Sequence, residues 1–157
     1  MKIHFWSIGK SHDLYVKLGV ETFSKRISHY YNVEWKIISS GKNTPGTSVI
    51  ELKRNEADNI LKLLDASDIL IVLEEKGKQL TSEKLAELIQ LNANKSAKNL
   101  VFLIGGAYGI DQKIINRANF VWSLSQLVFP HQLVRLILVE QVYRACTIIR
   151  NEKYHHS

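Results

Sequence analysis

The sequence predicts an α/β fold, with a mainly parallel sheet of five strands and helices on both faces. Strand-like and helix-like segments alternate five times along the chain, as in folds built from β-α units. The strand-like segments at 68–74 (DILIVLE) and 99–105 (NLVFLIG) have uninterrupted apolar interiors, as expected for strands that are covered on both sides. We expect one domain over residues 1–157, with a core large enough to need no disulfide or metal.

Each element follows from the period of its apolar residues and from the turn residues beside it. The first helix is placed by Leu14, Leu18 and Phe23, and the third by Thr81 or Ser82 as its N-cap. In chain order we expect a strand at 2–8, a helix from Ser11, a strand at 33–39, a loop at 41–48 with one of the two prolines, a helix at 49–65, a strand at 68–74, a helix at 81–97, a strand at 99–105, a short helix at 111–118, a strand at 120–125 and a closing helix from Pro130.

The closing helix is apolar over most of its circumference, so more than one of its sides must be covered. Its apolar residues are Leu133, Val134, Leu136, Ile137, Leu138, Val139, Val142, Tyr143, Ala145, Cys146, Ile148 and Ile149. We expect one side to pack on the sheet and the other to meet a second copy, in a homodimer. A polar stripe of Glu140, Arg144 and Thr147 remains. Glu140 and Arg144 have i,i+4 spacing, which by itself favours a structural ion pair over one that aims the arginine at a ligand.

Ligands of open α/β sheets bind beyond the carboxyl ends of the strands. The segment at 103–110 (LIGGAYGI) is glycine-rich there, which allows either close backbone approach to a ligand or a tight turn. Its glycines do not form the dinucleotide fingerprint. The segment at 123–131 (SLSQLVFPH) could wrap the apolar parts of a ligand while its backbone binds a heterocycle, or it could be an ordinary loop with Phe129 in the core.

Composition limits the class of protein. Lysine and arginine outnumber the acidic residues by 21 to 15, for a formal net charge of +6, which favours a polyanionic partner such as RNA. The single cysteine, Cys146, excludes a disulfide framework, and we expect it to be a small residue of the core. The sequence shows no signal peptide and no apolar run near the length of a membrane span, so we expect a cytoplasmic protein with no membrane partner. We also expect no metal.

Three motifs together closely resemble the small SPOUT-class methyltransferases of the ribosomal RNA large-subunit methyltransferase H family. They are LIGGAYG at 103–109, the run SLSQLVFPHQLVRLILVEQVYRA at 123–145, and the terminal YHH at 154–156. The resemblance extends over essentially the whole chain. It implies a homodimer with a C-terminal trefoil knot that holds S-adenosylmethionine, and methylation of N3 of a pseudouridine in 23S ribosomal RNA of assembled ribosomes. General topology rules would argue against a knot, so that expectation rests on the resemblance alone.

The resemblance also implies two sets of site residues. The cofactor is expected to contact Leu73, Gly105, Leu124, Ser125, Gln126, Leu127, Val128 and Phe129, and the methyl-acceptor site to contain Glu140, Arg144, Tyr154 and His155. We hypothesise that Arg144 stabilises negative charge on the base, that Glu140 holds Arg144, and that Tyr154 and His155 position the base and help to carry its proton. Many members of this family have proline before the Tyr-His pair and Arg or Lys after it, whereas this chain has Lys153 and His156.

Three alternatives stay open at this point. One is another SPOUT enzyme that methylates transfer RNA, and another is a ribosome-binding factor without catalysis. A flavodoxin-like flavin carrier is the third, although the turn after the first strand (SIGKSHD) lacks the Ser/Thr-rich phosphate loop that it would need. Substrate binding is expected to be electrostatic and to use Lys10, Lys17, Lys25, Arg26 and Lys153.

Overall fold

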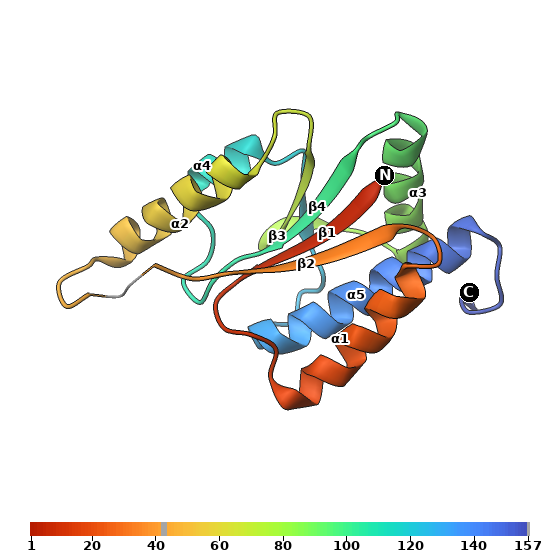
Figure 1. Cartoon of the computed structure of the whole chain (residues 1–157), viewed down its shortest axis with the longest axis horizontal. Helices are drawn as coiled ribbons and strands as arrows, with labels where there is room; N and C mark the ends of the chain where they lie inside the picture. Colours follow the sequence, from red (N-terminus) through yellow and green to blue (C-terminus); the bar gives the residue numbers. More distant parts are fainter. Residues whose placement is uncertain (42–43, 157) are drawn as a thin grey trace.

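The computed structural model describes residues 1–41 and 44–156, and there the chain forms five strands and five helices (Figure 1). The elements are β1 (Lys2–Ile8), α1 (Leu14–Ile27), β2 (Asn32–Ile38), α2 (Val49–Leu63), β3 (Ile69–Gln79), α3 (Ser82–Asn94), β4 (Asn99–Ile104), α4 (Gln112–Arg117), β5 (Phe120–Ser123) and α5 (His131–Ile149). The loop expected at 41–48 includes residues 42 and 43, which lie outside the described residues.

The strands form one sheet in the order β2-β1-β4-β3-β5, and every neighbouring pair is parallel. Helices α1, α3 and α5 cover one face, and α2 and α4 cover the other (Figure 1). Side chains alternate between the two faces along each strand, so Phe5 and Phe102 enter the core under α5, whereas Trp6 and Val101 enter the core under α2. The predicted α/β fold with a parallel sheet covered on both faces is therefore confirmed.

The face that α1 buries differs from the prediction. Leu14 is 88% exposed and Leu18 is 73% exposed, whereas Val16, Val20 and Ile27 are fully or nearly fully buried. The buried residues form their own stripe at helical spacing, and it packs on the sheet and on α5. The helix predicted from Leu14, Leu18 and Phe23 is present, but Leu14 and Leu18 lie on its exposed side.

Strand β3 continues past its apolar part, which the sequence indicated would end at residue 74. It reaches Gln79, and its pairing with β5 shifts register between Leu73 and Lys78, both of which pair with Trp122. Gly77 makes the shift possible, because a Cβ at Gly77 would lie 2.7 Å from the backbone carbonyl carbon of Trp122. The bulged residues between Leu73 and Lys78 then project at the carboxyl edge of the sheet.

Helix α5 packs against the sheet between α1 and α3, so helices of its own chain cover its flanks. Cys146 is buried as predicted, and burial raises the pKa of its thiol to about 12. Thr147 is also fully buried and donates to the backbone oxygen of Arg144 at 2.7 Å, so the polar stripe continues into the core. No helix within residues 1–41 and 44–156 is both long and apolar enough to cross a membrane.

Arg135 is a buried cation in α5 that the sequence reading left unassigned. Its side chain is 1% exposed, and its Nε donates to the Ser7 hydroxyl at 2.9 Å. Its Nη1 lies 3.3 Å from Nδ1 of His12, and burial followed by the charge of Arg135 lowers the pKa of His12. The Gln132 side chain accepts from the backbone N–H of Asp13 at 2.9 Å, so the start of α5 is tied to the loop after β1.

Candidate active site

A cavity of about 430 Å³ lies beyond the carboxyl ends of β3, β4 and β5. Seven of the eight residues predicted to contact a cofactor line it: Leu73, Gly105, Leu124, Ser125, Leu127, Val128 and Phe129. Gln126 is exposed and is not among the lining residues. The structure therefore gathers residues from three separate parts of the chain around one cavity, at the edge where open α/β sheets bind ligands.

The glycine-rich turn forms part of the cavity wall and is also a tight turn. Gly109 has φ +81°, and its N–H donates to the oxygen of Gly106 at 3.1 Å. A Cβ at Gly105 would lie 2.5 Å from Cγ1 of Ile110, another lining residue. The two interpretations of these glycines are thus compatible, because the turn brings bare backbone up to the cavity.

The segment that follows β5 covers another side of the cavity. The Ser123 hydroxyl donates to the Ser125 oxygen at 3.0 Å, and the Ser125 hydroxyl accepts from the Leu127 N–H at 3.0 Å. Leu127 and Val128 are 70% and 76% exposed, so their apolar side chains lie at an open surface of the cavity. Apolar side chains beside free backbone groups suit a ligand with a heterocycle and an apolar chain.

Several lining residues were not predicted: Glu74, Glu75, Ile104, Gly106, Ala107, Gly109, Ile110, Trp122, Ser123, His131 and Val134. Glu74 and Glu75 place two carboxyl groups at the cavity, which favours a ligand with positive charge. The sequence signal that could have identified these two residues was their position directly after the apolar part of β3. Trp122 is nearly buried, and its indole Nε1 has no hydrogen-bond partner among the residues that the structure describes.

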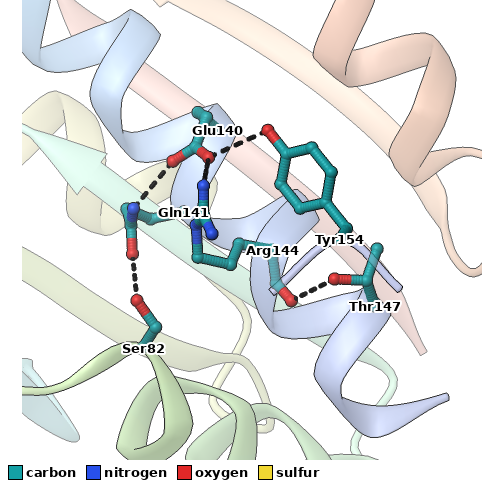
Figure 2. Close-up of polar contacts among 6 residues, drawn as sticks. All are labelled: Ser82, Glu140, Gln141, Arg144, Thr147 and Tyr154. Carbon is teal, nitrogen blue, oxygen red and sulfur yellow. Dashed lines mark hydrogen bonds and ion pairs between the residues drawn. The ribbon is translucent and has the colours of Figure 1, made fainter. Parts of the chain in front are cut away.

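A second group of polar residues surrounds the carboxylate of Glu140, in the second half of α5 (Figure 2). Arg144 donates to Oε1 of Glu140 from Nη2 at 2.6 Å and from Nε at 3.1 Å, and the Tyr154 hydroxyl donates to the same oxygen at 3.1 Å. The guanidinium also lies over the Tyr154 ring, 4.7 Å from its centroid. Burial, followed by the charge of Glu140, raises the pKa of Tyr154, so its hydroxyl stays a donor.

The other oxygen of Glu140 is bound from the opposite side. Oε2 accepts from Nε2 of Gln141 at 2.7 Å, and Oε1 of Gln141 accepts from the Ser82 hydroxyl at 2.7 Å. Ser82 belongs to the first turn of α3, so this chain of hydrogen bonds joins α3 to the carboxylate (Figure 2). Sequence reading assigned no role to Gln141, because its partner Ser82 is 59 residues away.

His155 is close to this group but is bound to another residue. Its Nε2 lies 2.7 Å from Oε1 of Glu83 in α3, and its side chain is 20% exposed. Of the four predicted acceptor-site residues, Glu140, Arg144 and Tyr154 are thus joined directly by hydrogen bonds. His155 instead contacts Glu83 of the neighbouring helix α3. Among residues 1–41 and 44–156, no group of three or more His, Cys, Asp or Glu side chains could hold a metal ion.

The polar group lies farther along α5 than the part of the helix that lines the cavity. His131 and Val134 line the cavity, and Arg144 follows Val134 by 10 residues in the same helix. At about 1.5 Å per residue, Val134 and Arg144 are about 15 Å apart along the helix axis. Within one protomer, Glu140, Arg144 and Tyr154 are not among the residues that line the cavity.

Comparison with known proteins agrees with the resemblance found in the sequence. Residues 1–155 match the family model described as "Predicted SPOUT methyltransferase". The chain is 47% identical over 156 residues to the ribosomal RNA large subunit methyltransferase H of Cytophaga hutchinsonii, covering 99% of this chain and 100% of that protein. It is 40% identical to proteins of the same name from Christiangramia forsetii and Trichlorobacter lovleyi, over 99% of this chain and at least 99% of each relative. The chain belongs to the SPOUT methyltransferases and, among these, to the ribosomal RNA large subunit methyltransferase H family.

Proposed function

We propose that this protein uses S-adenosylmethionine to methylate N3 of a pseudouridine in the 23S ribosomal RNA of assembled ribosomes. The cavity at the carboxyl edge of the sheet is the observation that carries the proposal, because it gathers the residues expected to contact the cofactor. The names of the relatives, which state methylation of large-subunit ribosomal RNA, support the substrate. The net charge of +6 suits an RNA partner. A cytoplasmic location is part of the proposal, because the proposed substrate is the ribosome.

The cavity fits S-adenosylmethionine in shape and in charge. Leu73, Gly105 and the segment 124–129 would hold it, with apolar side chains and backbone groups around the adenosine. Glu74 and Glu75 would face a ligand that carries a sulfonium and an ammonium group. The cofactor supplies an electrophilic methyl group when it is bound. We further propose that the C-terminal part, from β5 through α5, is threaded as the trefoil knot of the family.

The polar group in α5 is suited to the methyl acceptor. N3 of pseudouridine carries a proton, and its loss leaves negative charge on the neighbouring carbonyl oxygens. Arg144 is a fixed donor that stabilises this charge, and Glu140 holds the guanidinium through two hydrogen bonds. Tyr154 orients the base as a donor, and His155, which contacts Glu83, is the neighbouring group that would help to carry the proton.

The distance along α5 between the polar group and the cavity favours a homodimer. A base bound beside Arg144 lies about 15 Å, along α5, from Val134 at the cavity of the same protomer, which is too far for methyl transfer. A second copy that places its cavity against this group would complete the site. Leu14, Tyr15 and Leu18 of α1 are 64–88% exposed and supply an apolar surface for such a copy.

The predicted RNA-binding lysines and arginine are all exposed. Arg26 lies 5.6 Å from the centroid of the Tyr143 ring, which in turn contacts the Tyr154 ring at 4.7 Å. This places one cation of α1 next to the proposed acceptor site, where it could bind a phosphate. Binding through such contacts weakens as salt concentration rises.

Replacing Gly105 by alanine should weaken cofactor binding by roughly tenfold or more. The new Cβ would lie 2.5 Å from Cγ1 of Ile110 and would push that side chain toward the cavity. Isothermal titration with S-adenosylmethionine measures the effect. Adding Ile110→Ala should restore part of the affinity, and Gly41→Ala is a matched control because nothing lies within 4 Å of its Cβ. Equal affinity in Gly105→Ala and Gly41→Ala would show that the turn does not shape the binding site.

Mapping the modified nucleotide tests the proposed function. Ribosomes that lack the modification and bulk transfer RNA would each be incubated with the protein and S-adenosylmethionine, then digested and analysed by mass spectrometry. Methylpseudouridine from 23S RNA alone is the expected product. Methylated transfer RNA would identify a different SPOUT activity, and ribosome binding without cofactor binding would identify a non-catalytic factor.

A further inference from the structure

The first turn of α3 binds the proposed acceptor site at two points. The turn is capped by Thr81, whose hydroxyl accepts from the Lys84 N–H at 3.2 Å. The side chains of Ser82 and Glu83 also bind residues of the C-terminal part. Ser82 binds Gln141, 59 residues away, and Glu83 binds His155, 72 residues away. Two consecutive residues of one helix thus contact both halves of the site.

Ser82 anchors the Gln141 amide. The carboxylate of Glu140 can only accept, so the NH₂ group of Gln141 faces its Oε2, and Oε1 of Gln141 is left to accept from the Ser82 hydroxyl, as Figure 2 shows. With Gln141 on one oxygen and Arg144 on the other, the carboxylate cannot rotate about its terminal bond, which is otherwise a soft torsion. The plane of that carboxylate sets the position of the guanidinium, since Arg144 binds Oε1 through two nitrogens.

Glu83 determines which nitrogen of His155 carries hydrogen. Hydrogen bonds from its own backbone N–H, from Thr81 and from His155 lower the pKa of Glu83 to about 2. The carboxylate is therefore ionised near neutral pH and can only accept, so Nε2 of His155 is the donor in their 2.7 Å contact. The lone pair of the neutral ring is then on Nδ1.

We propose that the first turn of α3 is a positioning element for methyl transfer, in which Ser82 orients Glu140 and Arg144 through Gln141, and Glu83 sets the ring orientation and tautomer of His155. Neither residue touches the substrate in this scheme. The proposal rests on the proposed function, since it concerns how that acceptor site is held.

The test compares four variants with the wild-type protein: Ser82→Ala, Ser82→Thr, Glu83→Ala and Glu87→Gln. Glu87 lies on the same helix, is 64% exposed and binds only Lys84 among the described residues, so Glu87→Gln is the control. For each variant one would measure kcat and KM for methyl transfer, cofactor affinity, the thermal midpoint and the ¹⁵N shifts of His155.

Ser82→Ala and Glu83→Ala should each lower kcat by about tenfold with cofactor affinity unchanged, because each loses an orienting hydrogen bond to the site. The thermal midpoint should stay unchanged in Ser82→Ala and fall slightly in Glu83→Ala, which also loses the contacts of the carboxylate with Thr81 and with its own backbone N–H. Ser82→Thr keeps the hydroxyl and should recover most of the rate, and the control should match the wild type. In Glu83→Ala the ¹⁵N shifts should show that His155 has lost its preference for hydrogen on Nε2.

Two results would overturn the proposal while leaving the proposed function intact. One is wild-type kcat in both alanine variants. The other is a loss of activity that follows a lowered thermal midpoint, with His155 shifts unchanged, which would indicate a structural role only. A wild-type protein that transfers no methyl group would instead overturn the proposed function, and the positioning role with it.

Discussion

Replacing Arg144 by alanine is expected to lower kcat for methyl transfer by about 10²–10³-fold, the usual cost of removing a donor that stabilises charge in the transition state. The guanidinium is held by two hydrogen bonds to Glu140 and lies over the Tyr154 ring. Cofactor affinity should stay near the wild-type value, because Arg144 is not among the residues that line the cavity and is proposed to contact the base. Single-turnover rates and cofactor titration together measure the two effects.

Two further variants sharpen this prediction. Arg144→Lys keeps the charge but cannot make the paired contact with Glu140, so its rate should fall between those of the wild type and Arg144→Ala. Arg54 is an exposed arginine of α2, on the opposite face of the sheet, and Arg54→Ala should behave as the wild type. Normal turnover in Arg144→Ala with normal cofactor binding would remove this residue from the catalytic scheme.

Replacing Gly77 by alanine is expected to reduce the free energy of unfolding by about 2–3 kcal/mol. The added Cβ would lie 2.7–2.8 Å from the carbonyl carbon and nitrogen of Trp122 and from the nitrogen of Ser123. All three are backbone atoms, so no side-chain rotation relieves the contact. Because Trp122 and Ser123 line the cavity, cofactor binding should weaken as well.

Urea unfolding at a fixed protein concentration measures the stability of this variant. Gly41→Ala is again the matched control and should stay within about 0.5 kcal/mol of the wild type. If Gly77→Ala proves as stable as Gly41→Ala, the close approach of β3 and β5 at the register shift does not restrict this position.

The alternation of strands and helices was enough to predict the fold class, because uninterrupted apolar strands have few other arrangements. The rotation of α1 was not predictable in the same way. Leu14 and Leu18 fit a helical stripe as well as Val16 and Val20 do, and only packing on the sheet and α5 distinguishes the two. The bulge in β3 was missed for a similar reason, since its charged residues look like a loop until β5 is placed beside them.

Polar contacts between distant parts of the chain limited the prediction of the site. Arg135 was left unassigned because its partners Ser7 and His12 are 128 and 123 residues away. Most residues of the cavity lie in segments that follow a predicted strand, at 103–110 and 123–131. Glu74 and Glu75 also lie at a strand end, but no sequence motif marked them as site residues. Glu140 and Arg144 were the exception, because i,i+4 spacing in a helix brings them together locally.

The most direct test is transfer of a labelled methyl group from S-adenosylmethionine to ribosomes that lack the modification, with the wild-type protein and Arg144→Ala assayed in parallel. We expect label in 23S RNA with the wild-type protein and almost none with Arg144→Ala. Absence of label with a wild-type protein that binds the cofactor would contradict the proposed substrate, and equal labelling by both proteins would contradict the role of Arg144.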